Sequence, residues 1–203
     1  IKILLTGVWP VGQVGPMVLG YSAAGYFIYI LSSNLENRFA LLFRKFFPML
    51  LIPLVAMQLV SSYIRINAYG ITESRYYIVL FGLFSIVCSF MLIFSKRKNP
   101  NAIVLLSALF ALISIVPPAD AFSVSKNSQE NRLREILERN NMLVNNQVVQ
   151  NTDIPNEDKY EITNISNYLQ DMGYLEKIEW LPEEFADNYY ANFSKVYGFE
   201  QYY

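Results

Sequence analysis

The chain has 203 residues, of which 53% are apolar and 15% aromatic, whereas soluble domains average roughly 45–50% apolar. Histidine is absent, which removes the commonest metal ligand and the commonest general base. The sequence also contains no phosphate-binding loop, paired-cysteine metal site or serine–histidine arrangement. No catalytic, cofactor-binding or metal-binding residue is therefore predicted, and the familiar soluble enzyme classes are disfavoured.

The net charge of −1 hides an asymmetry between the two parts of the chain. Residues 1–121 carry nine basic and three acidic residues, a balance of +6, whereas residues 122–203 carry seven basic and fourteen acidic residues, a balance of −7. This split fits a membrane part with basic loops joined to a solvated acidic part that repels nucleic acid. We therefore predict an all-α fold, with a polytopic helical membrane domain at 1–121 and a small, mostly helical soluble tail at 122–203.

The membrane domain is predicted from the lengths of its apolar runs. A hydrocarbon core of roughly 30 Å needs about 20 apolar residues in a helix, because each residue rises about 1.5 Å. Charges or prolines bound three such runs, which predict spans at 46–64, 76–94 and 102–119.

The opening stretch is apolar but interrupted by Trp9-Pro10, Gly12, Gly15 and Pro16. It predicts the end of one helix at 1–7 and a span at about 14–31, with Pro16 near its first turn. Gly20, Ser22, Ala23, Ala24 and Gly25 give this span a small-residue surface suited to close packing. Because the chain starts at Ile1 without a basic leader, we interpret it as a fragment of a longer protein.

Orientation is predicted from Lys and Arg in the short connections. The connection 32–45 carries Arg38, Arg44 and Lys45, and the connection after the span 76–94 carries Lys96-Arg97-Lys98. Both are expected on the cytoplasmic side. The loop 65–75 and the tail then lie outside, which in a bacterium is the extracytoplasmic side of the inner membrane.

Three amphipathic helices are predicted in the tail. The first, Asn127–Asn141, starts at an Asn127 cap and carries the i, i+4 pairs Glu130–Arg134 and Glu135–Arg139. The second has an apolar stripe of Ile162, Ile165, Leu169 and Met172 and ends at Gly173. The third begins near Pro182, places Phe185, Tyr189 and Phe193 on one face and ends at Gly198. The acidic residues Asp153, Glu157, Asp158 and Glu161 lack the spacing of a calcium loop, which favours a solvated face.

A candidate interfacial polar site is formed by Arg65, Tyr69, Glu73, Arg75 and Asp120. One interpretation is a site for an anionic headgroup or substrate, with the two arginines as bidentate donors. The other is anchoring, because arginine and tyrosine commonly lie at headgroup level. Asp120 is expected to act as a clamp that pairs with Arg65 or Arg75.

Several motifs carry a resemblance to a known family. They are Arg65-Ile-x-x-Tyr69-Gly70-x-Thr72-x-x-Arg75-Tyr76, Trp9-Pro10-x-Gly12, Asp120-Ala-Phe-Ser-Val-Ser-Lys-Asn-Ser-Gln, Asn131-Arg-Leu and Gly173-Tyr-Leu-Glu. With these motifs the chain resembles the bacterial membrane-protein family called domain of unknown function 4153. The resemblance implies a longer parent protein with further amino-terminal spans, and it implies no activity.

Two functions of different classes follow from these patterns. The first is a non-enzymatic envelope sensor or assembly partner, inserted in the lipid bilayer, in which residues 122–203 bind an envelope protein. The alternative is a transporter or lipid-handling protein with an anion site at the outer membrane interface. No ionisable residue lies in the middle of a predicted span, where coupling sites usually lie, and this counts against the alternative. A membrane enzyme is a third possibility.

Overall fold

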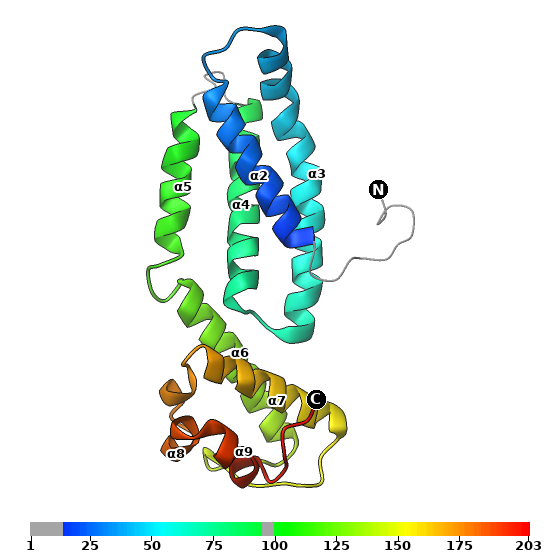
Figure 1. Cartoon of the computed structure of the whole chain (residues 1–203), viewed down its shortest axis with the longest axis vertical. Helices are drawn as coiled ribbons and strands as arrows, with labels where there is room; N and C mark the ends of the chain where they lie inside the picture. Colours follow the sequence, from blue (N-terminus) through cyan, green and yellow to red (C-terminus); the bar gives the residue numbers. More distant parts are fainter. Residues whose placement is uncertain (1–13, 95–99) are drawn as a thin grey trace. The chain divides into compact units, whose positions relative to one another are not determined.

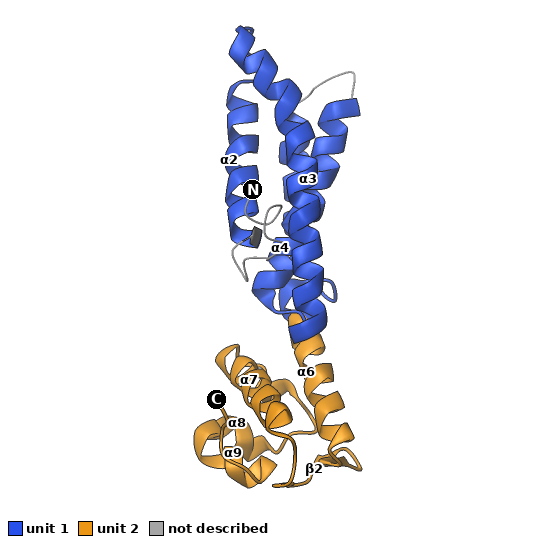
Figure 2. Cartoon of the chain, turned by 90° about the vertical axis from the view of Figure 1, so that its right-hand side faces the viewer, with its two compact units in different colours: residues 1–124 blue, residues 125–203 orange. Residues whose placement is uncertain are grey.

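The computed structural model describes residues 14–94 and 100–203. These residues are mostly helical, which confirms the all-α prediction, and the segment 1–7 lies outside them. The chain divides into two compact units, unit 1 (Ile1–Val124) and unit 2 (Ser125–Tyr203), coloured blue and orange in Figure 2.

In the described part of unit 1, four apolar helices run alongside one another (Figure 1). They are α2 (Val14–Leu31), α3 (Arg38–Tyr69), α4 (Glu73–Phe94) and α5 (Asn101–Ile113). Helix α4 packs against each of the other three. By length and composition α3 and α4 are long and apolar enough to cross a membrane, whereas α2 and α5 rank as shorter apolar helices.

Helix α3 is longer than the apolar run that predicted it. Its 32 residues extend over about 48 Å at roughly 1.5 Å per residue. Asn37 begins the helix, because its side chain accepts a hydrogen bond from Ala40 N at 2.8 Å. Gly70 ends it at φ 69°, donating its N–H to Ile66 O. The basic residues expected in the connection 32–45 therefore lie within the first turns of α3, and Arg65 lies in its last turns.

The last predicted span, 102–119, is helical only in its first part. Helix α5 ends at Ile113 and turns lead on through Pro117 and Pro118, which have no N–H to continue a helical ladder. The Tyr76 hydroxyl donates to Ala119 O at 2.5 Å, so the segment ends beside the first turn of α4.

The core of unit 1 is apolar and aromatic. Its buried members are Tyr26, Tyr29, Phe47, Leu51, Val55, Phe84, Cys88, Leu92 and Ile103. Within the predicted small-residue surface of α2, Gly25 makes the close approach, since a Cβ there would lie 2.0 Å from the Phe47 ring. At Gly20 no described residue comes within 4 Å of such an atom.

Hydrogen bonds between helices add to this packing. The Tyr26 hydroxyl of α2 donates to Ser85 O of α4 at 2.8 Å and lies 3.2 Å from Ser89 Oγ. On α3, Gln58 Nε2 donates to Ile78 O of α4 at 2.8 Å. Polar groups in an apolar interior are costly unless paired, so these contacts favour one register of α4 against its neighbours.

Unit 2 is helical with one small hairpin. Its elements are α6 (Ala121–Arg139, which crosses the division between the units), β1 (Leu143–Val144), β2 (Gln147–Val148), α7 (Asn156–Asp171), η1 (Leu175–Lys177), α8 (Glu183–Asp187) and α9 (Tyr189–Tyr197). In the hairpin Leu143 pairs with Val148, and Asn145 and Asn146 make the turn at φ 51° and 61°. Both turn residues are left-handed, as a type I′ hairpin turn requires. This hairpin was not among the elements predicted from the sequence.

The tail helices follow the predicted stripes but differ at their ends. The predicted Asn127 cap is wrong, because α6 begins at Ala121 behind Asp120. The predicted third helix is broken at Asn188 into α8 and α9. The glycine ends are confirmed, with φ 66° at Gly173 and 89° at Gly198.

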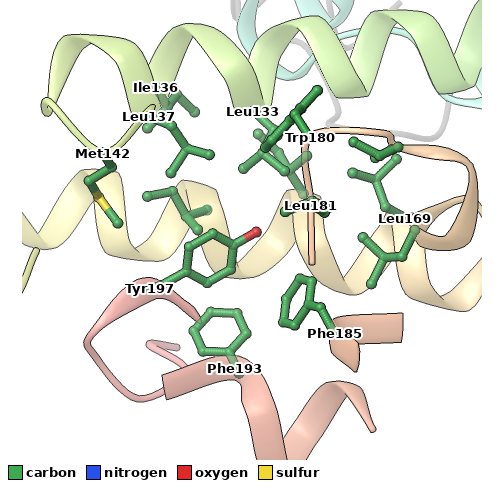
Figure 3. Close-up of a cluster of buried hydrophobic side chains, with 14 of the residues drawn as sticks. Leu133, Ile136, Leu137, Met142, Leu169, Trp180, Leu181, Phe185, Phe193 and Tyr197 are labelled. Carbon is green, nitrogen blue, oxygen red and sulfur yellow. The ribbon is translucent and has the colours of Figure 1, made fainter. Parts of the chain in front are cut away.

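The core of unit 2 gathers side chains from all of its helices (Figure 3). The α7 stripe of Ile162, Ile165 and Leu169 is buried in it, whereas Met172 is exposed. Aromatic rings fill the centre, and the centroids of Phe193 and Tyr197 lie 4.9 Å apart. Burial raises the pKa of the Tyr197 hydroxyl. Unit 2 therefore has a hydrophobic core of its own.

Candidate functional site

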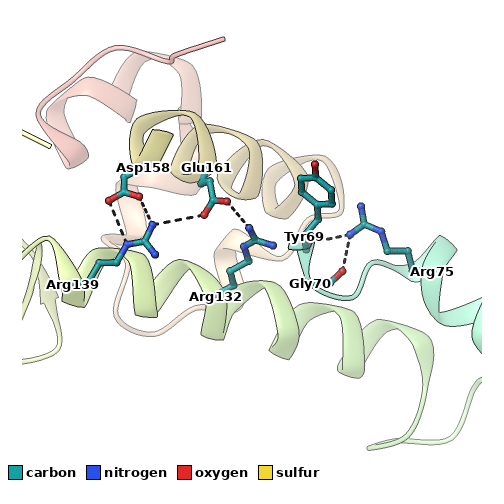
Figure 4. Close-up of polar contacts among 7 residues, drawn as sticks. All are labelled: Tyr69, Gly70, Arg75, Arg132, Arg139, Asp158 and Glu161. Carbon is teal, nitrogen blue, oxygen red and sulfur yellow. Dashed lines mark hydrogen bonds and ion pairs between the residues drawn. The ribbon is translucent and has the colours of Figure 1, made fainter. Parts of the chain in front are cut away.

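Arg75 of the candidate site caps the end of α3 (Figure 4). Its Nη1 donates to Tyr69 O at 3.0 Å and to Gly70 O at 2.7 Å. The guanidinium also lies 5.6 Å from the centroid of the Tyr69 ring. A cation at these last carbonyls offsets the negative end of the helix dipole.

Arg44 also donates to backbone carbonyls, at the other end of α3. Its guanidinium donates to Ser32 O at 2.8 Å, to Leu35 O at 2.9 Å and to Ser33 O. These carbonyls lie in the connection that follows the last residue of α2, so Arg44 holds that connection against the start of α3. Arg44, which predicted the orientation, and Arg75, which was predicted to bind an anion, therefore both donate hydrogen bonds to backbone carbonyls.

Arg65 and Arg75 line one small pocket of about 20 Å³. Ser61 and Ser62 of α3 lie one turn before Arg65 and line it too, together with Gly15, Pro16 and Ile78. The Nε–H of Arg65 is buried and has no hydrogen-bond acceptor among the described residues. The structure therefore brings the two predicted arginines together and leaves one guanidinium donor without an acceptor among the described residues.

Asp120 is placed differently from its predicted role as an ionic clamp. Its Oδ1 accepts hydrogen bonds from Phe122 N at 3.0 Å and Ser123 N at 2.9 Å, which caps the start of α6. Hydrogen bonds from the Ser123 hydroxyl and backbone hold the pKa of the Asp120 carboxyl below its usual value. Within residues 14–94 and 100–203, no ion pair joins Asp120 to Arg65 or Arg75.

Glu73 and Tyr69 complete the predicted set. Glu73 is the first residue of α4, two positions before Arg75. Tyr69 is the last residue of α3 and is 55% exposed. Neither residue lines the pocket that Arg65 and Arg75 share.

An apolar cavity of about 360 Å³ lies between α2, α4 and α5. Its lining residues are Leu19, Tyr77, Leu80, Phe81, Phe84, Ser107, Phe110, Ala111 and Ser114. Sequence reasoning missed it, because each of the three helices carries only part of its wall. Helical spacing of Ser107, Phe110, Ala111 and Ser114 on α5 is the one signal that could have indicated it.

Unit 2 contains an ion-pair network between α6 and α7 (Figure 4). Arg139 contacts both carboxylate oxygens of Asp158, and Asn140 Nδ2 donates to Asp158 Oδ2 at 2.7 Å. Arg139 also lies 3.9 Å from Glu161, whose other oxygen is 2.7 Å from Arg132 Nη2. Asp158 is only 7% exposed, so the prediction of a solvated acidic face is wrong at this residue.

The predicted i, i+4 pairs of α6 are also wrong. Glu130 instead pairs with Lys126 at 3.0 Å and accepts a hydrogen bond from Trp180 Nε1 at 3.1 Å. Arg134 lies over the Trp180 ring, 5.4 Å from its centroid. One i, i+4 pair therefore forms within α6, but it is Lys126–Glu130, and partners from elsewhere in unit 2 contact Arg134 and Arg139. An i, i+4 pair is worth only about 0.2–0.5 kcal/mol, so such partners can outweigh it.

Asp158→Asn is expected to destabilise unit 2 by about 1–2 kcal/mol at pH 7. The expected loss is kept this small because Arg139 is half exposed and solvent screens its ion pair with Asp158. Burial raises the pKa of Asp158, but hydrogen bonds from Arg139 and Asn140 outweigh it and leave the pKa lowered. The ionised carboxylate therefore stabilises unit 2 above the unfolded-state pKa of about 4, and this contribution disappears as the pH falls through the folded-state pKa.

Urea unfolding of the whole protein between pH 3 and pH 7 measures this effect. Trp180 fluorescence in a Trp9→Phe background reports on unit 2, because the chain has two tryptophans. Asp153→Asn is the matched control, since Asp153 is an exposed carboxylate just before α7. Equal stabilities of the Asp158 and Asp153 variants at pH 7 would contradict the proposed contribution of the network.

Comparison with known proteins identifies one family. The family described as Domain of unknown function (DUF4153) matches residues 6–146. The Gly173-Tyr-Leu-Glu motif lies beyond this match, although the sequence analysis included it in the resemblance. No curated protein and no solved structure matches the chain. Because the match covers unit 1, the start of unit 2 and more than half of the sequence, the chain belongs to the DUF4153 family.

Proposed function

We propose that the chain is a multi-pass protein of the bacterial inner membrane, in which unit 2 acts outside the cytoplasm as a non-enzymatic sensor or assembly partner. The observation that carries this proposal is the contrast between the two units. Unit 1 exposes large apolar side chains along its helices, whereas unit 2 encloses a core beneath a surface rich in acidic residues.

The exposed side chains of α3 and α4 support insertion into lipid. They include Met49, Leu50, Leu54, Val60, Ile64, Leu83, Val87, Phe90 and Phe94. Monomeric soluble proteins rarely expose apolar patches larger than a few hundred Å². The charge-free part of α3, residues 46–64, extends over about 28 Å, close to the thickness of a hydrocarbon core.

The direction of the helices supports several crossings. Gly15, near the start of α2, contacts Ile78 near the start of α4, and Ala119 lies beside Tyr76. The connection 70–72 joins α3 to α4 at that same end. Residues 32–37, which join α2 to α3, lie at the opposite end of α3. On this arrangement α2, α3, α4 and the segment 101–119 alternate in direction.

Side-specific thiol labelling in cells tests the topology. Single cysteines replace Asn34, Asn67 and Asn127, which are all exposed, in a Cys88→Ala background. Asn67→Cys and Asn127→Cys are expected to react with an impermeant maleimide from outside, and Asn34→Cys only after permeabilisation. Labelling of Asn34→Cys and Asn67→Cys from the same side would refute a membrane-spanning α3.

A truncation tests the role of unit 2. Removing residues 125–203 is expected to abolish co-purification of an envelope partner after crosslinking in cells, while the truncated protein stays in the membrane fraction. The control is Tyr190→Ala, which alters an exposed side chain and leaves the core intact. Unchanged partner recovery by the inserted truncation would refute the proposed role of unit 2.

The second candidate function is a transporter or lipid-handling protein with an anion site at the outer interface. It is favoured by the pocket that Arg65 and Arg75 share. Arg65→Gln is then expected to reduce uptake or lipid export without reducing insertion. Full transport by the inserted variant would eliminate this candidate.

A further inference from the structure

We propose that unit 1 binds one anionic phospholipid at the contact between α2 and α4, with the phosphate at Arg65 and an acyl chain in the apolar cavity. This inference rests on the membrane location proposed above and names the ligand class of the second candidate function. Two independent features carry it, the pocket of Arg65 and the cavity between α2, α4 and α5.

The pocket of Arg65 provides donors for a phosphate. Ser61, Ser62 and Arg65 lie on one face of α3, three and four residues apart, and all line the pocket. Its volume of about 20 Å³ accommodates roughly one water-sized oxygen atom. The buried Arg65 Nε–H lacks an acceptor among the described residues, and a phosphate oxygen matches a guanidinium donor in charge and geometry.

Arg75 makes this end of α3 suitable for an anion. The carbonyls that end a helix carry partial negative charge and repel anions. Arg75 donates to two of these carbonyls, Tyr69 O and Gly70 O, while its side chain lines the pocket. Among the described residues the pocket is lined by two cations and by no carboxylate, which favours an anionic headgroup over a zwitterionic one.

The cavity between α2, α4 and α5 is suited to an apolar chain. Its volume of about 360 Å³ falls in the range of about 300–1,000 Å³ seen for small-molecule pockets. The hydroxyls of its two serines donate to backbone carbonyls of the same segment, Ser107 to Val104 O at 2.8 Å and Ser114 to Ala111 O at 2.7 Å. The wall therefore offers mainly carbon to an occupant.

The pocket and the cavity border the same helix contact. On α2, Gly15 and Pro16 line the pocket and Leu19, one turn later, lines the cavity. On α4, the neighbours Ile78 and Tyr77 line the pocket and the cavity respectively. A phospholipid has the anionic group and the hydrocarbon chain that these two adjoining features require.

Native mass spectrometry of the whole protein tests the headgroup contact. The protein is released from mixed micelles of palmitoyl-oleoyl phosphatidylglycerol and palmitoyl-oleoyl phosphatidylcholine, and the retained lipid is counted. The wild type is expected to prefer phosphatidylglycerol, and Arg65→Gln to reduce that preference about tenfold. Arg38→Gln is the matched control, because Arg38 is an exposed arginine at the other end of α3.

A second pair of variants tests the acyl chain contact. Ala111 and Ala108 are both exposed on α5, but only Ala111 lines the cavity. Ala111→Phe places a ring in the cavity and is expected to weaken phosphatidylglycerol retention about tenfold, whereas Ala108→Phe adds the same ring outside the lining and leaves retention unchanged. Glycerol phosphate, which lacks acyl chains, is expected to compete poorly. If it competes as well as the lipid and Ala111→Phe binds normally, the site takes a free phosphate and the lipid proposal is overturned.

The remaining outcomes also decide the proposal. Arg65→Lys keeps the charge without the Nε donor, and an intermediate preference supports the contact even if Arg65→Gln does not fold. Unchanged preference in either folded Arg65 variant overturns the lipid site. In that case labelling of Asn34→Cys and Asn67→Cys from opposite sides still supports membrane insertion, so the two failures are distinguishable.

Discussion

Replacing Phe193 by alanine is expected to destabilise unit 2 by about 4 kcal/mol, within the range of about 3–5 kcal/mol for deletion of a buried phenylalanine. The Phe193 side chain is fully buried, and its ring lies 4.9 Å from Tyr197 and 5.8 Å from Tyr189 and Phe199, centroid to centroid. Tyr189 and Tyr197 are the first and last residues of α9, and Phe199 follows the Gly198 that ends this helix. The backbone therefore holds these three rings, and they cannot collapse readily into the vacated space.

Urea unfolding followed by Trp180 fluorescence measures this loss in the Trp9→Phe background. Trp180 is buried in the same cluster as Phe193, so its emission follows the core. Tyr190→Ala on the same helix removes a ring that is 70% exposed, and it is expected to cost less than about 1 kcal/mol. Similar losses for Phe193→Ala and Tyr190→Ala would show that the aromatic cluster is not the core of unit 2.

Gly25→Ala is expected to destabilise unit 1 by about 2 kcal/mol. The added methyl group would lie 2.0 Å from Cε2 and 2.2 Å from Cζ of Phe47, and such overpacking costs typically about 1–3 kcal/mol. Phe47 cannot easily move away, because its ring packs against Tyr26 at 5.4 Å and Phe43 at 5.1 Å, centroid to centroid.

Cys88 provides the readout for this change. It is the single cysteine of the chain and is fully buried in the same core as Phe47. Maleimide labelling of its thiol in detergent-solubilised protein should become roughly 30-fold faster in Gly25→Ala, the ratio that corresponds to about 2 kcal/mol. Gly20→Ala, with no atom near the new methyl group, should label no faster than the wild type. Equal labelling of the two variants would rule out close α2–α3 packing at Gly25.

The sequence predicts the helices of this chain better than their ends. Long apolar runs and stripes such as Ile162, Ile165 and Leu169 identify helices, because burial of one face dominates the energy of a helix. The ends depend on weaker local contacts. Asp120 caps α6 where Asn127 was predicted to, because a helix starts at the first side chain that can satisfy its free N–H groups.

Of the five residues in the candidate site, the sequence predicts the proximity of Arg65 and Arg75 but not the contacts that the five residues make. The spacing of Arg65 and Arg75 across Gly70 places both at one end of the α3–α4 pair, and the structure brings them to one pocket. Asp120 follows a non-helical segment, so helical periodicity does not predict the direction of its carboxylate. The cavity beside α5 and the partner of Arg139 on α7 depend on packing between distant segments, which no local pattern encodes.

Arg44 and a lysine at the same position would carry the same charge, but the contacts of Arg44 require a guanidinium. On the topology proposed above, membrane insertion requires only a positive charge at this end of α3 to keep it in the cytoplasm, and either residue supplies that charge. The folded protein requires a planar fork that reaches the carbonyls of Ser32, Ser33 and Leu35 together. On that topology a lysine at position 44 would still orient the chain during insertion, but it would hold the connection between α2 and α3 less firmly than Arg44 does.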